Sequence, residues 1–246
     1  MITYLLSVLL VGWQGIARDS VLAEGVRLAG MQPAAALLRF EAVLARDSLD
    51  AEANWRAAIA LNDLAEPLES TNRDTLLARA QGYARRAVRI GPENARALFS
   101  LGLILGNQAL SRGLKERVRS AVEIRELALR ALTADSLLDG AHHLLGRWNY
   151  EVMRLSGFER FVARKLLGGG TLGRASWAEA QRELERAVAL DPTRIYHRLD
   201  LARVYLARRD RDGASAQLDA LARLPDRVAA DSSYRRQARE LLSALR

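Results

Sequence analysis

Small or apolar residues recur along this chain in a fixed order, with steps of four and then three residues. Residues spaced in this way lie on one face of an α-helix. A Pro or Ser follows five residues after the third position, where the helix is expected to have ended. The pattern occurs at Ala36–Ser48, Ala80–Pro92, Ile124–Ser136 and Ala180–Pro192, with a weaker copy at Ala214–Pro225. The chain therefore predicts a series of helices that each bury one narrow face.

This spacing is typical of tetratricopeptide repeats, whose units of about 34 residues fold as pairs of helices. The first helix of the next unit should carry Leu-Gly, or two small residues, nine and ten positions after the Pro or Ser. Leu101-Gly102 and Leu145-Gly146 stand at those positions. A small residue is needed there because the two helices of a unit cross closely. The pattern predicts an all-α fold, a tetratricopeptide-like solenoid of helical hairpins with insertions.

The repeats are unevenly spaced, so extra residues must lie between some of the helices. We expect a loop at Pro67–Asp74 with caps at Asn72–Asp74, a break at Gly113, and the longest insertion around Gly168–Gly173. Residues 18–246 should form a single solenoid, because one repeat cannot bury its apolar face alone. Its end is expected to be covered by an amphipathic capping helix at about 231–246.

The N-terminus carries an apolar segment from Ile2 to Trp13, followed by small residues at Gly15 and Ala17. Small residues at this spacing fit a signal-peptidase site, although no Lys or Arg precedes the segment. The segment is shorter than the roughly 20 apolar residues that span a bilayer. Residues 1–17 are therefore expected to be a signal peptide or a first apolar helix, and an exported, periplasmic location is favoured over the cytoplasm.

Composition agrees with the helical pattern and excludes several kinds of functional site. Hydrophobic residues make up 50% of the chain and aromatic residues 6%, while Ala, Leu and Arg, which favour helices, dominate. The net charge is +8, but the arginines are spread along the helices among glutamates and form no run, so we do not expect nucleic acid as a partner. The absence of cysteine excludes disulfides, thiolate metal sites and cysteine nucleophiles.

Candidate catalytic and cofactor motifs are weak. Gly168, Gly170 and Gly173 match G-x-G-x-x-G, but a dinucleotide site also needs a preceding strand, and a helix is expected there. His142 and His143 are adjacent, so on a helix they point about 100° apart and cannot hold one metal ion together. We therefore expect no enzyme activity, no cofactor and no metal.

The first helices of stacked hairpins line the concave surface of a solenoid, so their inward positions are the candidate binding residues. Aromatic residues and arginines at such positions suit an extended peptide, or an amphiphile with an anionic group. Alternatively, some of these residues pack against the insertions. The candidate partner-binding residues are Trp55, Phe99, His143, Arg147, Tyr150, Tyr196 and Arg203, with Ile59, Leu103 and Leu199 beside them.

A longer signature names a group of relatives. The stretch from His143 to Val152 reads His-Leu-Leu-Gly-Arg-Trp-Asn-Tyr-Glu-Val, and it follows Gly113-Leu-Lys-Glu-Arg-Val. Together with the insertion after the Trp-containing helix, these segments resemble the regulator of microtubule dynamics protein family over about Ala95 to Tyr205. The resemblance implies an all-helical domain without enzyme activity. Its eukaryotic members are linked to microtubules and to tethering at organelle membranes, some with lipid handling.

The signature also suggests specific contacts. We expect Trp148 to pack on the insertion near Phe158 and Phe161, where it would hold the extra helix against the solenoid. Glu151 lies four residues after Arg147, so the two side chains share a helix face and are expected to pair.

The leading hypothesis is a scaffold that binds a peptide or a partner protein in its concave groove. The alternative is a lipid-binding, amphiphile-binding or membrane-associated tethering module. A continuous apolar groove covered by the insertion would favour lipid, and a groove rimmed by charge would favour peptide. In the membrane alternative, anionic head groups would contact Arg154, Arg160, Arg164 and Lys165.

Overall fold

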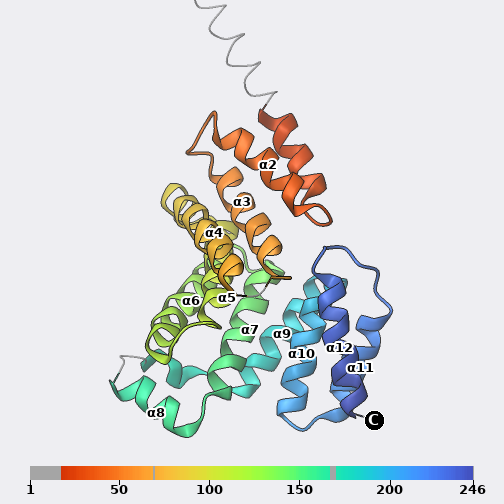
Figure 1. Ribbon diagram of the computed structural model, residues 1–246. Coiled ribbons are helices and arrows are strands. Elements are labelled where there is room, and N and C mark those ends of the chain that lie inside the picture. Colours follow the sequence, from red (N-terminus) through yellow and green to blue (C-terminus); the bar gives the residue numbers. More distant parts are fainter. Residues whose placement is uncertain (1–17, 69, 167–169, 246) are drawn as a thin grey trace, which may run out of the picture.

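The computed structural model describes residues 18–68, 70–166 and 170–245, and every regular element in these ranges is helical (Figure 1). The expected signal peptide at 1–17, Gly168 and the side chain of Arg164 lie outside the described residues. After a helical segment at 18–28, the helices are α2 (Pro33–Leu44), α3 (Ala51–Ala65), α4 (Ser70–Ile90), α5 (Ala95–Ala109), α6 (Leu114–Ala134), α7 (Asp139–Arg154), α8 (Gly157–Leu166), α9 (Trp177–Leu190), α10 (Ile195–Ala207), α11 (Arg211–Ala222) and α12 (Asp231–Leu245).

The helices pack as consecutive pairs, as the repeat pattern predicts. Helix α3 packs on α4, α5 on α6, and α10 on α11. Helix α7 packs on α9, although α8 and a short 3₁₀ helix, η1 (Gly170–Arg174), lie between them in the sequence. The prediction of an all-α, tetratricopeptide-like solenoid of helical hairpins with insertions is confirmed.

The positions that define the repeat pattern form the core. Ala80, Ala84 and Ala87 of α4 are completely buried. The equivalent residues of the other second helices are buried too: Ala36, Phe40, Val43, Ile124, Ala128, Ala131, Ala180, Leu184, Ala187, Ala214, Leu218 and Leu221. The alanines at most of these positions let the helices of a pair approach closely.

The Gly of the Leu-Gly pairs marks the closest approach. A Cβ atom built on Gly146 would lie 2.6 Å from Cγ of Leu184 and 3.1 Å from its backbone nitrogen. A Cβ atom on Gly102 would lie 2.5 Å from Cδ2 of Leu144, which is the flexible end of a side chain. A larger residue than Gly is therefore excluded more strictly at 146 than at 102.

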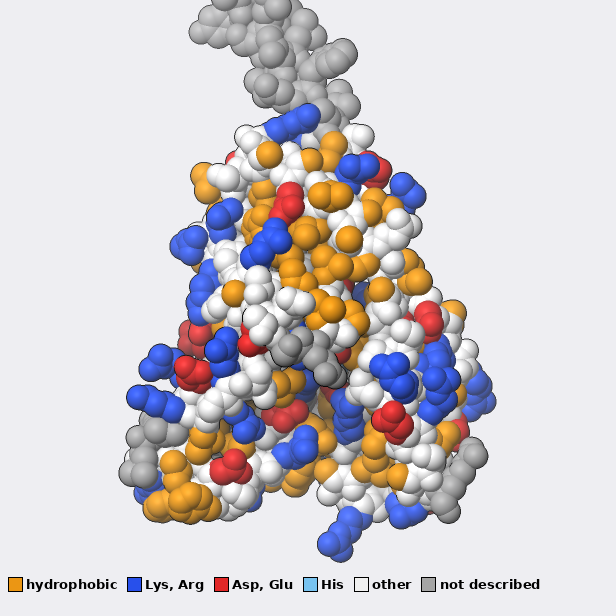
Figure 2. All heavy atoms as spheres, viewed as in Figure 1, with side chains coloured by type: hydrophobic (Ala, Val, Ile, Leu, Met, Phe, Trp, Pro, Cys, Tyr) orange, Lys and Arg blue, Asp and Glu red, His pale blue; other side chains and the backbone are white. Residues whose placement is uncertain are grey.

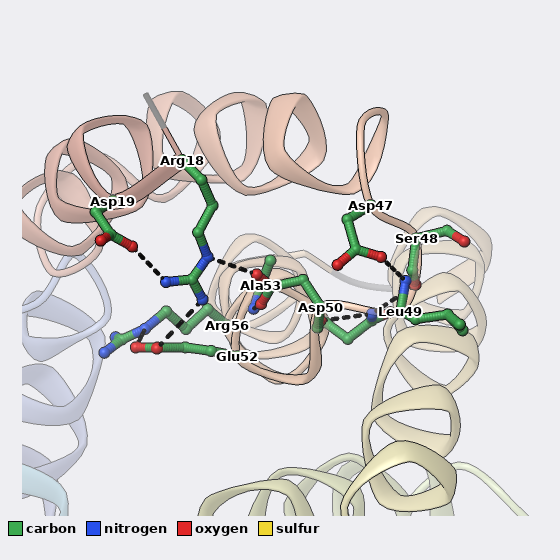
Figure 3. Close-up of polar contacts among 10 residues, drawn as sticks. Arg18, Asp19, Asp47, Ser48, Leu49, Asp50, Glu52, Ala53 and Arg56 are labelled. Carbon is green, nitrogen blue, oxygen red and sulfur yellow. Dashed lines mark hydrogen bonds and ion pairs between the residues drawn. The ribbon is translucent and has the colours of Figure 1, made fainter. Parts of the chain in front are cut away.

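A carboxylate at the start of α3 attaches the helical segment 18–28 to the next hairpin (Figure 3). Asp50 accepts a hydrogen bond from the backbone N–H of Ala53 at 2.8 Å, which caps the helix, and another from Nε of Arg18 at 2.7 Å. Burial raises the pKa of Asp50, but the bonds from Arg18 and Ala53 outweigh burial and leave it lowered. Asp50 is therefore ionised at neutral pH and holds both elements.

One loop differs from expectation. Helix α4 already begins at Ser70, so Asn72–Asp74 lie inside the helix and do not cap its start. The sequence from Ser70 onward can propagate as helix once it is supported by packing on α3, which outweighs the capping preference of Asn and Asp. The break at Gly113 is present, and this residue precedes α6.

The segment before α12 returns to the first turn of the described chain. The backbone N–H of Ala229 donates to the carbonyl of Gly30 at 3.0 Å, and a Cβ atom on Gly30 would lie 2.6 Å from the carbonyl oxygen of Arg227. Asp231 shapes this segment, because its carboxylate accepts the N–H groups of Arg227 at 2.7 Å and Val228 at 2.9 Å. The helix expected at about 231–246 corresponds to α12, and it packs on α10 and α11.

Among the described residues, no helix combines the length and the apolar character needed to cross a bilayer.

Candidate partner-binding groove

The first helices of the hairpins surround a cavity of about 470 Å³, which we call the groove. It is lined by α3, α5, α7 and α10 and by Arg73 of α4, with α12 and the segment before it on the remaining side. No described residue of the insertion between α7 and α9 lines it. Its main lining residues are Trp55, Ile59, Asn62, Asp63, Arg73, Arg96, Phe99, Leu103, Asn107, His143, Arg147, Tyr196, Leu199, Asp200, Arg203, Val228, Tyr234 and Gln237.

The structure brings six of the seven candidate residues to this one cavity. Trp55, Phe99, His143, Arg147, Tyr196 and Arg203 all line it, together with the flanking Ile59, Leu103 and Leu199. Tyr150 lies elsewhere and packs against Trp177 of α9, with ring centroids 5.9 Å apart. Tyr150 lies three residues after Arg147 on α7, and its ring is part of the contact between α7 and α9.

Several groove residues were not among the candidates. Tyr234 and Gln237 come from α12, which the repeat pattern does not place against the concave surface. Asp63 and Asp200 also line the groove, and both are carboxylates in the sequences of first helices.

Asp200 is the centre of the polar network in the groove. Its carboxylate accepts Nε2 of His143 at 2.9 Å and Nη1 of Arg203 at 2.6 Å. Arg203 also donates to Oε1 of Gln237, which connects α10 to α12. Burial raises the pKa of Asp200, but the bond from His143 and the charge of Arg147 outweigh it and hold the pKa far below its usual range. The network is therefore a fixed negative charge with cations around it.

A second pair, between His197 and Asp139, also joins α10 to α7. Nε2 of His197 is 2.8 Å from the carboxylate of Asp139, and the His197 side chain is fully buried. Burial lowers the pKa of His197 to about 4, against the opposing hydrogen bond to Asp139. His197 is thus neutral at physiological pH. Together with the edge-on ring of Tyr196, 4.4 Å away between centroids, it supports one wall of the groove.

The candidate metal ligands are all held by protein partners. Nδ1 of His142 is 2.7 Å from the carboxylate of Glu183, and its Nε2 is 3.1 Å from the carbonyl oxygen of Ser136. Within the described ranges, no group of three or more His, Asp or Glu side chains is placed to hold a metal ion. The histidines of this chain join neighbouring helices.

Arg147 is one of three groove arginines, with Arg73 and Arg96, that form no ion pair with a described residue. Its side chain is half-buried and lines the groove, and among the described residues no carboxylate oxygen lies within 4.0 Å of its guanidinium. The expected pair with Glu151 does not form, because Glu151 is instead 4.0 Å from Arg154. Burial lowers the pKa of Arg147, but the charges of Asp200 and Glu151 outweigh burial and leave it raised. Arg147 thus presents a permanent positive charge to the groove.

Asp63 gives the groove a group that titrates near neutral pH. Nδ2 of Asn62 lies 3.5 Å from its carboxylate, and Nδ2 of Asn107 donates to Oδ1 of Asn62 at 2.7 Å. Burial raises the pKa of Asp63 to about 7, assisted by the nearby negative charge of Glu66. The groove therefore becomes more positive as the pH falls through 7.

The free energy of unfolding should depend less on pH in the Asp63→Asn variant than in the wild type. The pKa of Asp63 in the folded protein, about 7, exceeds its ordinary value of 3.8, so the folded state binds more protons between these values and loses stability as the pH rises through this range. We expect the free energy of unfolding of the variant, relative to wild type, to increase by about 1–2 kcal/mol between pH 4 and pH 8, because solvent in the groove screens the charge.

Denaturant titrations at several pH values measure this difference. Asp212→Asn, at an exposed aspartate of α11, is the control and should leave the pH profile unchanged. Parallel profiles for wild type and Asp63→Asn would show that Asp63 does not titrate in this range.

The Trp-containing signature contacts different partners from those expected. Trp148 is buried against α6, where its Nε1 donates to the carbonyl of Ala121 at 2.7 Å. The expectation that it packs near Phe158 and Phe161 is wrong, because both phenylalanines are exposed. On α7, Trp148 points toward the helix of the preceding hairpin, which offers a larger apolar surface than the short insertion.

Asn149 makes the contact to the insertion. Its Oδ1 accepts the backbone N–H of Ser176 at 3.1 Å, at the end of the insertion, and its Nδ2 donates to the carbonyl of Leu145 at 2.9 Å. Ser176 in turn caps α9 by accepting the N–H of Glu179 at 3.0 Å. The signature thus joins three elements around α7: α6 through Trp148, the insertion through Asn149, and α9 through Tyr150.

A smaller apolar cavity of about 90 Å³ lies between α5, α6 and α7. Arg147 and Leu110 line both this cavity and the groove, so the two spaces meet at Arg147. Leu155 and Leu172 of the insertion close its far side. The insertion therefore covers the apolar cavity and leaves the groove uncovered.

Hairpins that stack in this order around a concave groove define a tetratricopeptide-repeat protein. Among solved structures, a thermophilic TPR protein of Thermus thermophilus has a similar fold, with a TM-score of 0.61, 20% identity, and coverage of 92% of this chain and 99% of that one. PilF of Pseudomonas aeruginosa is similar with a TM-score of 0.55 and 18% identity, covering 94% of this chain and 90% of that one. These likenesses establish the fold.

The family is given by sequence. The model for regulator of microtubule dynamics proteins 1-3 matches residues 29–246, so the chain belongs to this family. Regulator of microtubule dynamics protein 1 of Bos taurus is 27% identical over 202 residues, which are 80% of this chain and 62% of the bovine protein. Protein 3 of Bos taurus is 31% identical over 113 residues, which are 46% of this chain and 24% of that protein. The chain thus spans less than two thirds of the length of these relatives.

Proposed function

We propose that this protein is a non-enzymatic interaction scaffold that binds an extended, acidic segment of a partner protein in its groove. The tetratricopeptide fold is one typical of protein-interaction scaffolds. The proposal treats residues 18–246 as one solenoid whose four central hairpins and α12 form a single site.

The observation that carries the proposal is the convergence of inward positions from four first helices on one cavity. Trp55, Phe99 and Tyr196 supply aromatic faces to it from three different helices. Rigid aromatic side chains contribute large contact areas at low entropic cost, and they dominate the energetics of many interfaces. A segment crossing the groove would meet a ring on α3, on α5 and on α10, and Arg147 and His143 on α7 between them.

The charge of the groove supports an acidic partner. Six arginines line it against four carboxylates: Arg56, Arg73, Arg96, Arg147, Arg194 and Arg203 against Asp63, Glu66, Asp139 and Asp200. Several of these charges already have partners, such as Arg56 with Glu52 at 2.9 Å and Arg194 with Asp191 at 3.0 Å. Arg147 is available for a carboxylate of the partner, and such a charge-assisted hydrogen bond is worth about 1.5–3 kcal/mol.

Affinity selection from a displayed library of random peptides tests this function. The full chain should select peptides rich in Asp, Glu and aromatic residues, and Arg147→Met should reduce their binding at least about tenfold, the equivalent of 1.4 kcal/mol. Arg119→Met, at an exposed arginine of α6, is the matched control. Selection of no acidic consensus, or a consensus that Arg147→Met binds equally well, would contradict the proposal.

An amphiphile is the second candidate, and the apolar cavity behind Arg147 favours it. An anionic head group at Arg147 could extend a short apolar tail between α5 and α6, beneath Leu172. The cavity is small, and the groove in front of it is rimmed by charge, so the peptide is the leading candidate. Native mass spectrometry of the protein purified from its host separates the two, because a co-purifying amphiphile would appear as a defined mass increase that Leu144→Trp removes.

A further inference from the structure

Helix α8 exposes two large aromatic side chains. Phe158 is 76% exposed and Phe161 is 58% exposed. They are three residues apart and Lys165 follows four residues after Phe161, so all three lie on one face of α8. Phenylalanine is among the residues most often buried, and two exposed rings side by side need a partner. We call Phe158, Phe161 and Lys165 the α8 face.

The opposite side of α8 packs against the rest of the protein, so the α8 face points toward solvent. Ala163 of α8 and Leu155 just before it are buried, and α8 packs on α6 and η1. Ser156 and Glu159 cap the helix reciprocally: the N–H of Ser156 donates to the Glu159 carboxylate at 2.9 Å, and the N–H of Glu159 donates to the Ser156 hydroxyl at 3.2 Å. Figure 1 places α8 at a corner of the molecule, and Figure 2 shows apolar side chains gathered there.

The insertion that carries α8 is basic. From Ser156 to Ser176 the sequence contains Arg160, Arg164, Lys165 and Arg174 against one acid, Glu159. Lys165 and Arg174 are exposed, and so is Arg154 at the end of α7. Aromatic rings next to exposed cations form the combination that enters the headgroup region of membranes containing anionic lipids.

We propose that the α8 face docks this protein on the surface of an anionic membrane. The rings of Phe158 and Phe161 insert at the level of the lipid head groups, while Lys165, Arg154 and Arg174 contact the anionic lipids. A stable protein–protein interface needs about 800 Å² per partner, far more than two phenylalanine side chains provide. The same two rings suffice for weak, reversible membrane binding reinforced by basic residues.

Co-sedimentation of the full chain with lipid vesicles tests this surface. Wild type should bind vesicles of phosphatidylcholine mixed with phosphatidylglycerol, and bind vesicles of phosphatidylcholine alone at least about tenfold more weakly. Phe158→Ser combined with Phe161→Ser should lower partitioning to the mixed vesicles by about tenfold or more. Lys165→Glu should lower it less, and added salt should weaken the remaining binding.

Leu49→Ser combined with Leu137→Ser is the matched control, because these leucines are 65% and 64% exposed on other parts of the surface. This variant should partition like wild type. Circular dichroism checks that each variant is folded, and light scattering reports the oligomeric state. Vesicle binding that the double serine variant retains would overturn the inference. So would a concentration-dependent dimer that this variant loses, since the α8 face would then bind a second copy.

This inference does not rest on the proposed function of the groove. No residue of the α8 face lines the groove, so the double serine variant should bind the selected acidic peptides as wild type does. Failure of vesicle binding would not contradict peptide binding in the groove. Failure of peptide selection would not contradict membrane binding by the α8 face.

Discussion

Replacing Trp148 with alanine is expected to lower the free energy of unfolding by about 3–5 kcal/mol, as for other buried large aromatic residues. The indole is buried between α7 and α6, and removing it would open a cavity next to the one that already lies between α5, α6 and α7. It would also leave the carbonyl of Ala121 without its 2.7 Å hydrogen bond from Nε1. Chemical denaturation of the full chain measures the loss.

Two further variants separate the contributions of Trp148. Trp148→Phe keeps most of the apolar contact but loses the hydrogen bond, so it should cost about 1–2 kcal/mol. Trp55→Ala, in the half-buried groove position, should cost about 1 kcal/mol or less while weakening peptide binding. Equal stability of wild type and Trp148→Ala would refute an architectural role for the signature.

The second large effect is expected at Gly146, where alanine should destabilise the protein by about 1–3 kcal/mol. Alanine is the better helix former by about 1 kcal/mol, so the expected loss runs against intrinsic propensity. The new Cβ would lie 2.6 Å from Leu184 Cγ and 3.2 Å from the carbonyl oxygen of Ala180. Helices α7 and α9 would have to move apart, and the contacts around the insertion with them.

At Gly82 we expect alanine to have the opposite effect on stability. Gly82 lies on an exposed face of α4, and a Cβ atom there would have no neighbour within 4 Å. Gly82→Ala should therefore stabilise the protein by about 0.5–1 kcal/mol. Thermal melts of both variants test the pair, and a gain in stability for Gly146→Ala would show that the α7–α9 crossing is looser than described.

The fold could be predicted because the residue spacing that determines it is local and recurs in each repeat. Small or apolar residues stand at the offsets of Ala80, Ala84 and Ala87 in five helices, and each copy buries the same narrow face. Gly146 was predictable for the same reason, since the close helix crossing occurs at a fixed distance from the preceding repeat. The start of α4 at Ser70 was missed because packing on α3 decided it, and capping preference is a weaker effect.

The groove could be predicted only where it follows the repeat. Arg147 and Tyr196 were found by counting positions along first helices, and the cavity contains both. Tyr234 was not, because α12 reaches the groove through a return of the chain that depends on the contact between Ala229 and Gly30. That contact joins residues about 200 positions apart, and no local pattern indicates it.

The sequence identifies the residues of the signature but not the partners that they contact. Nearness in sequence to Phe158 does not indicate the partner of Trp148. A helix face points toward whichever neighbour packs there, and for Trp148 this is Ala121 on the preceding hairpin. Asn149 was passed over because a single Asn gives no periodic signal, although it holds the end of the insertion.

Hydrogen exchange with a defined acidic ligand tests the central claim, that the groove binds acidic protein segments. Random copolymers of glutamate and tyrosine serve as the ligand, and copolymers of lysine and tyrosine as the matched control. The acidic copolymer is predicted to slow exchange in α3, α5, α7, α10 and α12, which line the groove. The lysine copolymer should not, and Arg147→Met should reduce the protection. Protection confined to α6, α9 and α11, or equal protection by both copolymers, would contradict the account.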